Sequence, residues 1–397
     1  MNAPSTSVGG AFSSCVGLLH TIASGRLGGW VLEYVLLVGV VVVLTALSSF
    51  VAVKRPVLVP AGGGPSEPEG PRLARTWTPF DLVLVVVLVS FSALRWQVGT
   101  DFGMYMRFHE VAQPAQDWWS QVDYFQQEAG YTFTSLLVKS MFPDWPFALL
   151  WVTSALTVIP VYAVIRGNSN NLVMSTLLYV LLAFYVAPFN IVRQGIAIAF
   201  AFWAYSFLGR RNALFVVLGV VAVLFHSSAA AALIVMLIAR RWKPTPRSTV
   251  LVLGGAAVAA ASIWTLPAVR DLAALLNDRY EMYLTTAQAA GAGTYLVIAA
   301  FAALAFLMLG NRRFVDRPDW LAMLIIGVAF LIVGSQLVPA VRLFYYFGIF
   351  AVLLVPDTLR NRPNSGVLSA AVVIAAGVFF IVYLQNYGGL LPYQTYL

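Results

Sequence analysis

Charged and polar side chains stand at the ends of several long apolar segments of this sequence. Arg95 closes one segment and is soon followed by Asp101. Arg193 and Gln194 open a second segment, and Arg342 opens a third. Ionisable groups beside lipid are costly to bury and usually mark functional sites. Because a guanidinium pairs with two phosphate oxygens and stays charged when buried, these arginines predict a site for a large anionic ligand, such as a lipid-linked pyrophosphate.

Each of these side chains also has a purely structural interpretation. Arg95 and Arg342 could simply extend to the membrane surface. Asp101 could only favour the start of a helix at 102–111. His226, which interrupts another apolar stretch, could be a hydrogen-bonded core residue. The two tyrosines that follow Arg342 by a turn could be ordinary members of the aromatic belt at the membrane surface.

Composition predicts a membrane protein. Of the 397 residues, 60% are hydrophobic and 10% are charged, whereas a soluble domain carries about 25% charged residues. With a mean hydropathy of +0.83, the chain could not solvate a globular surface, so lipid must cover it. The net charge of +8 is spread over short loops, which indicates membrane orientation and lipid phosphates, and no nucleic acid. Cys15 is the only cysteine, so no intrachain disulfide can form.

Apolar segments long enough, or nearly so, to cross about 30 Å of hydrocarbon recur along the chain. The expected spans are 30–53, 79–96, 146–166, 171–188, 190–208, 248–264, 293–310, 320–338, 341–356 and 366–385. We therefore expect an all-α, polytopic transmembrane helical bundle with about ten full spans. Residues 1–397 would form a single transmembrane domain with a membrane core at 30–385. A linker rich in Pro and Gly, 54–78, would lie in the cytoplasm, and residues 1–29 show no cleaved signal peptide.

Basic residues between the spans predict the orientation. The basic loops contain Lys54, Arg55, Arg72, Arg75, Arg166, Arg210, Arg211, Arg240, Arg241, Lys243, Arg247, Arg312, Arg313, Arg317, Arg360 and Arg362. With all of them in the cytoplasm, the spans alternate and both termini lie outside. A single span at 212–239 would break this pattern, because basic clusters flank it on both sides. A hairpin of two short helices, 213–225 and 227–239, keeps both clusters inside, and one long tilted helix is the alternative.

This orientation places two loops, 97–129 and 265–292, on the extracytoplasmic side. The first contains charged residues among the aromatic residues Trp118, Trp119, Tyr124 and Phe125. The second is amphipathic and is expected to lie on the membrane surface. The segment 130–142 is too short to span and is expected to re-enter from the outer face. The arginines and the histidine introduced above all fall in the outer half of the membrane, although the orientation argument did not use them.

Several catalytic signatures are absent from the sequence. It has no phosphate-binding loop that ends in Gly-Lys-Ser/Thr, no HExxH motif and no set of Cys and His suited to a metal. It also lacks GxSxG and an Asp-x-Asp that could hold a metal-bound sugar nucleotide. We therefore expect no metal and no cofactor.

Five short motifs, in this order, resemble the EpsG family of polysaccharide polymerases, which are Wzy-like membrane glycosyltransferases. The motifs are Arg95-x-x-Val98-Gly99-Thr100-Asp101-x-x-x-Tyr105, Glu128-x-Gly130-Tyr131, Arg193-Gln194-x-x-Ala197, Phe225-His226-x-Ser228-Ala229 and Arg342-x-x-Tyr345-Tyr346. The resemblance covers about residues 80–395. The long linker 54–78 and Phe102, where a tyrosine would be expected, depart from the family pattern without touching the proposed chemistry.

The resemblance implies a GT-C-like fold and synthesis of an exopolysaccharide or capsule at the outer face of a bacterial plasma membrane. The substrates would be oligosaccharide repeat units linked to undecaprenyl pyrophosphate. The enzyme would transfer the growing glycan from one lipid carrier to the non-reducing end of another repeat unit, with inversion at the anomeric carbon. Membrane lipid would surround it, and a protein that regulates chain length could be a partner.

The resemblance also suggests roles for individual residues. The residues expected to bind the pyrophosphate are Arg193, Arg342, Arg95 and Gln194. Asp101 is the first choice for the base that takes the acceptor proton, with His226 and Glu128 as rivals. Three tyrosines, Tyr105, Tyr345 and Tyr346, are weaker candidates for contact with the glycan. The arginines would neutralise charge that builds on the leaving pyrophosphate, which could replace a metal ion.

Other functions compete with this interpretation. The chain could be another glycosyltransferase that uses a lipid-linked sugar, or an O-antigen-type ligase, which differs only in its acceptor. From a different class, it could be a flippase or transporter of lipid-linked oligosaccharides, although such proteins often show paired halves with broken helices, which are not evident here. A membrane O-acyltransferase lacks a convincing His/Asn pair, and a scaffold would have no need for buried arginines.

Overall fold

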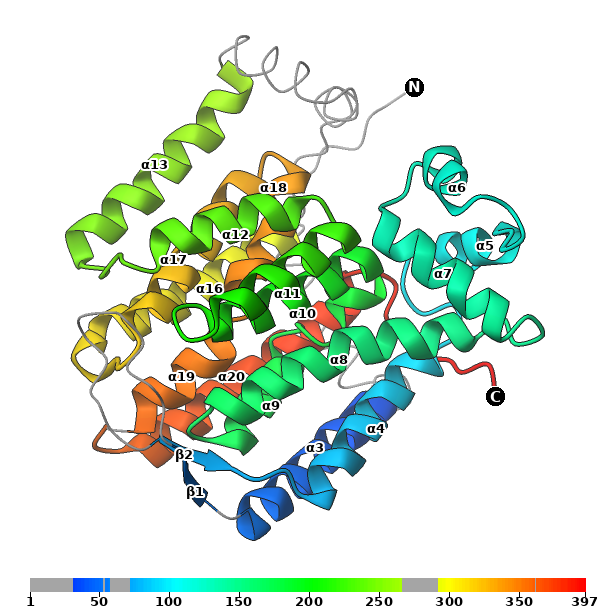
Figure 1. Cartoon of the computed structure of the whole chain (residues 1–397). Helices are drawn as coiled ribbons and strands as arrows, with labels where there is room; N and C mark the ends of the chain where they lie inside the picture. The colour runs from blue at the N-terminus through cyan, green and yellow to red at the C-terminus, as the bar shows by residue number, and fades with distance from the viewer. Residues whose placement is uncertain (1–30, 53, 58–71, 266–291, 361) are drawn as a thin grey trace, which may run out of the picture.

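Helices account for nearly all of the structure, a computed structural model that describes residues 31–52, 54–57, 72–265, 292–360 and 362–397 (Figure 1). The helices of the first half are α3 (Leu32–Val51), α4 (Pro79–Ala93), α5 (Phe102–Val111), α6 (Trp118–Phe125), α7 (Ala129–Met141), α8 (Ala148–Asn168) and α9 (Leu172–Leu181). Those of the second half are α10 (Val192–Phe207), α11 (Asn212–Phe225), α12 (Ser228–Ala239), α13 (Pro246–Thr265), α16 (Ala292–Gly310), α17 (Pro318–Gly334), α18 (Val338–Gly348), α19 (Ala351–Arg360) and α20 (Ser365–Asn386). Two short 3-10 helices are η1 (Ala187–Phe189) and η2 (Arg312–Phe314).

Four helical segments are long and apolar enough to cross a membrane by length and composition. They are Leu32–Val51, Ala148–Asn168, Ala340–Arg360 and Ser365–Asn386. Six shorter apolar helices lie among the described residues. The chain is therefore a helical membrane protein, while the expected number of about ten full spans stays a prediction.

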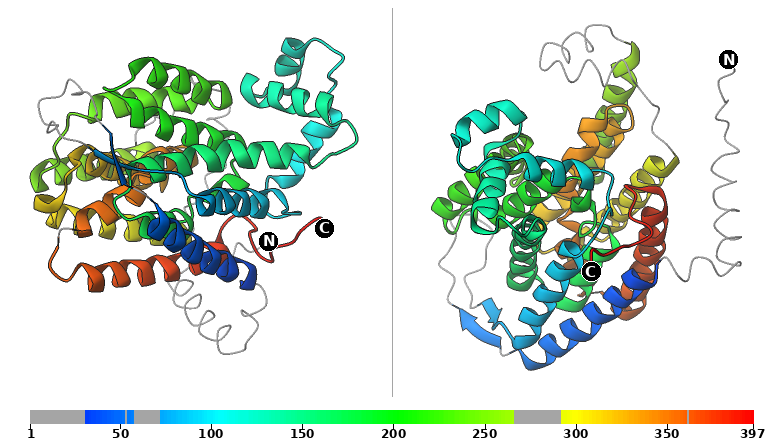
Figure 2. Two further views of the ribbon diagram at one scale, coloured as in Figure 1. Left: turned by 60° about the horizontal axis from the view of Figure 1, so that its bottom comes forward. Right: turned by 90° about the vertical axis from the view of Figure 1, so that its right-hand side faces the viewer.

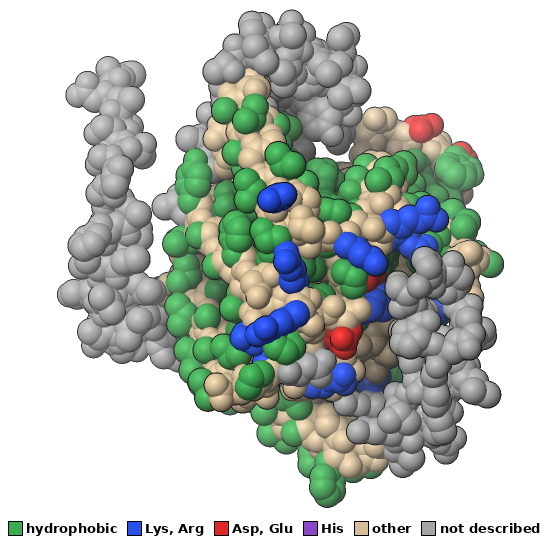
Figure 3. All heavy atoms as spheres, turned by 90° about the vertical axis from the view of Figure 1, so that its left-hand side faces the viewer, with side chains coloured by type: hydrophobic (Ala, Val, Ile, Leu, Met, Phe, Trp, Pro, Cys, Tyr) green, Lys and Arg blue, Asp and Glu red, His purple; other side chains and the backbone are tan. Residues whose placement is uncertain are grey.

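The ends of the helices that carry the basic loops gather at one end of the bundle, which we call the basic end. Lys and Arg side chains cluster on this face (Figure 3). A Cβ on Gly209, after α10, would lie 3.1 Å from Nη2 of Arg240, which follows α12. Arg360, at the end of α19, lies 4.0 Å from Asp316, just before α17. These approaches place the ends of α10 and α12, and the end of α19 and the start of α17, at one end of the bundle, while the expected orientation in the membrane stays a prediction.

A buried ion pair joins two helices at the basic end. Thr78 accepts a hydrogen bond from the backbone N–H of Asp81, and Pro79 occupies the first turn, so α4 begins with a capping box. The same Asp81 carboxylate accepts a hydrogen bond from Nε of Arg166 at 3.1 Å. Arg166 lies in the last turn of α8, so this pair fixes the start of α4 beside the end of α8.

The segment between the two flanking basic clusters folds as the hairpin that they predicted. Helices α11 and α12 are separated at His226, whose backbone is extended with φ −161° and ψ 124°. Arg210 and Arg240, on either side of the hairpin, line one pocket at the basic end. The tip at His226 therefore points toward the opposite end of the bundle, which excludes the single long helix.

Two predicted segments differ from the structure. The expected span 171–188 is helical only to Leu181, because Ala183 adopts a left-handed φ of 64° and Pro188 cannot continue a helix. The irregular stretch is buried by neighbouring helices, which makes non-helical backbone tolerable at this depth. The expected linker 54–78 contains two short strands, β1 (Lys54–Val57) and β2 (Arg72–Arg75), which pair antiparallel. The fold is thus helical with one small β-ladder, and the linker is not wholly irregular.

The opposite end of the bundle carries α5, α6 and α7 beside the C-terminal segment (Figure 2). The predicted short helix at 130–142 is α7, which packs against α6, α8 and α11. The C-terminal segment pairs with the chain after α4: the N–H of Trp96 donates to Gln394 O at 2.8 Å, and that of Gly99 donates to Gly389 O at 3.1 Å. Most of the predicted outer loop 265–292 and the N-terminal residues 1–30 lie outside the described residues.

Candidate active site

A group of polar side chains lies at the end of the bundle opposite the basic end. We call Glu128, Arg193, His226, Ser228 and Tyr346 the Glu128 cluster. Arg193 donates a short hydrogen bond from Nη1 to Glu128 Oε2. Glu128 Oε1 lies 3.6 Å from His226 Nδ1. About a fifth of each of these three side chains is exposed, so the cluster is neither sealed in the core nor freely solvated.

Glu128 reaches the cluster because α7 begins against the tip of the hairpin. It is the N-cap residue of α7, yet its side chain makes no capping hydrogen bond and is free to face Arg193. A Cβ on Gly130 would lie 2.8 Å from the carbonyl oxygen of Leu224. Only glycine permits this approach of α7 to α11 without a shift. Gly130 therefore sets the position of Glu128 relative to His226.

Arg193 and Arg342 come from separate helices that Gln194 ties together. Gln194 Nε2 donates to the backbone carbonyl of Arg342 at 2.9 Å, which joins the start of α10 to α18. The close turn from α17 to α18 also helps to place Arg342. A Cβ on Gly334 would lie only 2.6 Å from the backbone nitrogen of Val341. The Arg342 side chain is exposed and has no carboxylate partner among the described residues. Arg342 is therefore available to an anionic ligand.

His226 is held by both of its neighbours in the hairpin tip. The N–H of Ser228 donates to His226 Nδ1 at 3.3 Å, so a neutral ring carries its proton on Nε2. The Ser228 hydroxyl lies 3.2 Å from Nδ1 and 3.1 Å from the hydroxyl of Tyr346. Protonation of Nδ1 would replace the hydrogen bond from the Ser228 N–H with an ion pair to Glu128.

Asp101 lies near this cluster but outside its hydrogen bonds. It is half-buried at the N-cap of α5, without a capping bond, and its Oδ1 accepts from Thr100 Oγ1 at 3.2 Å. Tyr105, one turn later, lies within the electrostatic influence of both Asp101 and Arg193 and hydrogen bonds to Arg193. The described structure shows no hydrogen bond or ion pair from Asp101 to Glu128 or His226.

The comparison with known families covers the part of the chain that contains this site. The model of the EpsG family matches residues 80–395. The chain belongs to the EpsG family. No curated protein and no solved structure matches it, so the expected GT-C-like fold stays a prediction. The family match covers every residue of the Glu128 cluster and indicates a membrane polysaccharide polymerase.

Arg95 has a different environment from the other two arginines of this EpsG protein. It is 3% exposed and stacks on the ring of Phe189, with 4.6 Å from its guanidinium carbon to the ring centre. Nη1 donates to the carbonyl and hydroxyl oxygens of Ser92. Tyr34 and Tyr185 are among the rings around it. A buried cation in this position holds the C-terminal end of α4 in place, and a pyrophosphate could reach it only after rearrangement.

The three tyrosines predicted to touch the glycan are mostly turned inward. Tyr105 and Tyr346 are 5% and 0% exposed, so neither presents a ring face to a sugar. Tyr345 directs its hydroxyl to that of Tyr383 on α20 at 3.1 Å. In contrast, Trp119 and Tyr124 on α6 are 62% and 81% exposed. The segment 97–129 therefore presents more aromatic surface to solvent than Tyr105 and Tyr346 do.

Two parts of the site were not among the predicted site residues. Ser228, visible in the sequence only as part of a motif, links the hairpin tip to Tyr346. Asn190 accepts hydrogen bonds from the N–H and hydroxyl of Thr100 at 2.6 and 2.9 Å, which fixes the turn before Asp101. In the sequence, the one signal that pointed to Asn190 was its position three residues before Arg193. Within the described part of the chain, no group of three or more His, Cys, Asp or Glu residues could hold a metal ion.

Proposed function

We propose that the protein polymerises exopolysaccharide or capsule repeat units carried on undecaprenyl pyrophosphate. The glycan on one carrier would pass to the non-reducing end of the repeat unit on another, at the outer face of the plasma membrane. The observation that supports this is the convergence of Arg193, Glu128 and His226, with exposed Arg342 nearby, at the end of the bundle opposite the basic loops. By the positive-inside rule, that end faces outward.

Arg193 and Arg342 would bind the pyrophosphate of the donor. The two guanidinium groups carry two positive charges to a ligand rich in phosphate oxygens. When the bond between the anomeric carbon and the pyrophosphate oxygen breaks, its electron pair stays on that oxygen. The arginines would neutralise this developing charge, which is the interaction that accelerates such a reaction.

Glu128 is the carboxylate that the geometry favours as the base, in preference to Asp101. In the structure without substrate, Glu128 is paired with Arg193. A pyrophosphate that takes over Arg193 would release the carboxylate. Glu128 could then accept the proton of the acceptor hydroxyl while the hydroxyl oxygen attacks the anomeric carbon, a single displacement that inverts its configuration. His226, 3.6 Å away, would receive or share that proton.

The exposed aromatic side chains of α6 would bind sugar rings. Trp119 stands edge-on to Phe133 at 4.9 Å and still presents most of its surface to solvent. Aromatic faces of this kind are suited to the apolar faces of sugars beside a membrane. The acceptor and donor glycans would therefore lie across α5, α6 and α7.

Purified protein in lipid nanodiscs, supplied only with a lipid-linked repeat unit, tests this function. We expect a ladder of longer glycans and stoichiometric release of undecaprenyl pyrophosphate. Arg193→Ala and Arg342→Ala should each lower the rate by about 100-fold or more, because each removes a charge that stabilises the leaving group. Exposed Arg241→Ala, at the basic end, is the matched control.

Each rival function gives a different result in the same assay. Transfer to a different acceptor lipid, with no ladder, would indicate a ligase. Movement of intact substrate across the bilayer without release of the carrier would indicate a flippase. Normal polymer from both arginine variants would refute the pyrophosphate assignment.

A further inference from the structure

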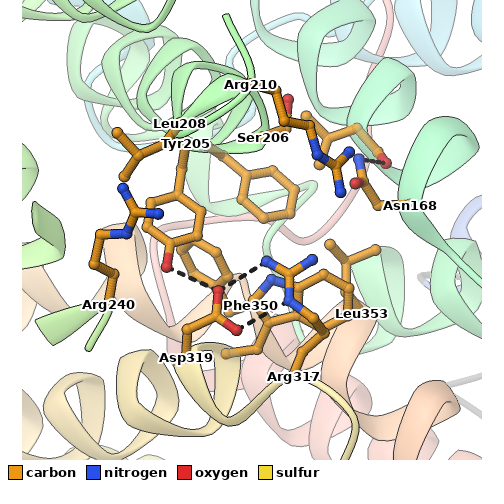
Figure 4. Close-up of a pocket in the computed structure, with 13 residues that line it drawn as sticks. Asn168, Tyr205, Ser206, Leu208, Arg210, Arg240, Arg317, Asp319, Phe350 and Leu353 are labelled. Carbon is orange, nitrogen blue, oxygen red and sulfur yellow. Dashed lines mark hydrogen bonds and ion pairs between the residues drawn. The ribbon is translucent and has the colours of Figure 1, made fainter. Parts of the chain in front are cut away.

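A second polar site lies at the basic end of the bundle. Figure 4 shows a pocket with Arg210, Arg240 and Arg317 on different sides and Tyr205 and Asp319 between them. Tyr205 lies 12 residues after Arg193 on α10, so about 18 Å of helix separates this pocket from the Glu128 cluster. The pocket plays no part in the proposed polymerisation.

The pocket carries an excess of positive charge. Arg317 forms two hydrogen bonds to Asp319, at 3.0 and 2.8 Å, and Tyr205 donates to the same carboxylate at 2.9 Å. This pair is neutral overall. The side chain of Arg240 is half-buried, makes no hydrogen bond or ion pair with any described residue and faces the hollow (Figure 4). Arg210 adds a further guanidinium to the lining.

The hollow suits a phosphate group in size and surroundings. Its volume is about 60 Å³, whereas one water needs about 10–15 Å³ on the same scale. The space therefore holds several waters or one phosphate group. Its remaining walls include the apolar rings of Phe202 and Phe350. Arg210 and Arg240 are half-exposed, so a ligand can reach the charged side from the surface of the bundle.

We propose that this pocket binds the phosphate of an anionic phospholipid from the inner leaflet. Basic residues at helix ends face that leaflet under the positive-inside rule. Basic pockets between transmembrane helices on this side suit lipid head groups, whose phosphates are present there at high local concentration. Arg240 contacts the phosphate, Arg210 faces it from the opposite wall, and the apolar rings lie against the glycerol and the start of the acyl chains.

Native mass spectrometry of the delipidated full-length protein, titrated with phosphatidylglycerol, tests the proposal. Arg240→Gln should weaken the tightest lipid adduct by about tenfold or more, since a hydrogen bond between charged groups is lost. Arg240→Lys should restore part of that loss. The control is Arg241→Gln, which removes the same charge from an exposed neighbour outside the pocket and should change the affinity by less than about twofold.

Two further ligands identify the source of the phosphate. Phosphatidylcholine should bind the wild-type protein more weakly than phosphatidylglycerol, and millimolar inorganic phosphate should displace the tight adduct. Equal lipid affinity of the wild-type protein and Arg240→Gln would overturn the site. Thermal stabilisation by inorganic phosphate, with lipid adducts insensitive to Arg240→Gln, would overturn a lipid as its occupant. Neither result bears on polymerisation, which is assayed separately.

Discussion

Replacing Glu128 with glutamine removes the charge that pairs with Arg193 but nearly preserves the shape of the side chain. The two side chains are 21% and 19% exposed, so their pairing is stronger than that of a surface ion pair. We take its free energy as about 1–2 kcal/mol. If a pyrophosphate must displace Glu128 from Arg193, Glu128→Gln should bind undecaprenyl pyrophosphate about five- to thirtyfold more tightly.

The same variant should turn over more slowly. Loss of a general base costs about 100-fold or more in rate. Tighter binding together with slower turnover is an unusual combination, because most damage to a site weakens both. Microscale thermophoresis with undecaprenyl pyrophosphate measures the first quantity, and release of that carrier in nanodiscs measures the second.

Two controls complete this experiment. Asp144→Asn removes an exposed carboxylate from the turn after α7 and should change neither quantity. Asp101→Asn should affect turnover less than Glu128→Gln does. Weaker binding of undecaprenyl pyrophosphate by Glu128→Gln would refute the exchange of partners by Arg193. Unchanged turnover in that variant would return Asp101 to first place as the base.

Two other predictions concern the end of the bundle that carries α5 and α7. Gly130→Ala should lower polymer yield at least about tenfold, because a Cβ would meet the Leu224 carbonyl at 2.8 Å. The control is Gly103→Ala, whose Cβ would meet nothing within 4 Å. Equal yields from the two variants would contradict the role of Gly130. Burial and the nearby charge of Lys139 lower the pKa of His109 to about 4 from its usual 6.5. Since the folded state favours the neutral ring, stability should be full above pH 6.5 and fall as the pH drops from 6.5 toward 4, by at most about 3 kcal/mol. Hydrogen exchange of α5 and α7 should show this loss, and its persistence in His109→Gln would exclude that histidine as the cause.

The sequence predicted the parts of this molecule that depend on local signals. Basic residues flanking an apolar segment indicated the hairpin, because both flanks had to lie on one side of the membrane. His226 was the polar interruption that marked its tip. The level shared by Arg193 and Arg342 followed from the alternation of spans, and the structure joins their helices through Gln194.

Other features depend on contacts that composition and periodicity do not encode. The bond between Glu128 and Arg193 joins residues 65 positions apart, and nothing local favoured it over a role for Asp101. The ring packing around Arg95 brings together distant segments, so its burial was not predicted. The end of α9 at Leu181 was also missed, because the apolar composition of the residues before Pro188 does not distinguish a helical backbone from an irregular one.

The pairing of the C-terminal segment with the turn after α4 means that folding cannot finish until synthesis is complete. Tyr393, in that segment, donates to the carbonyl of Phe91, 302 residues earlier. At a synthesis rate of about 5–20 residues per second, the segment after α4 waits roughly 15 to 60 s for its partner. During this interval the backbone between Arg95 and Thr100 lacks its hydrogen-bond partners from the C-terminal segment, although α4 has already been inserted. Membrane quality-control proteases would therefore find their best opportunity at this edge, in chains whose synthesis stalls late.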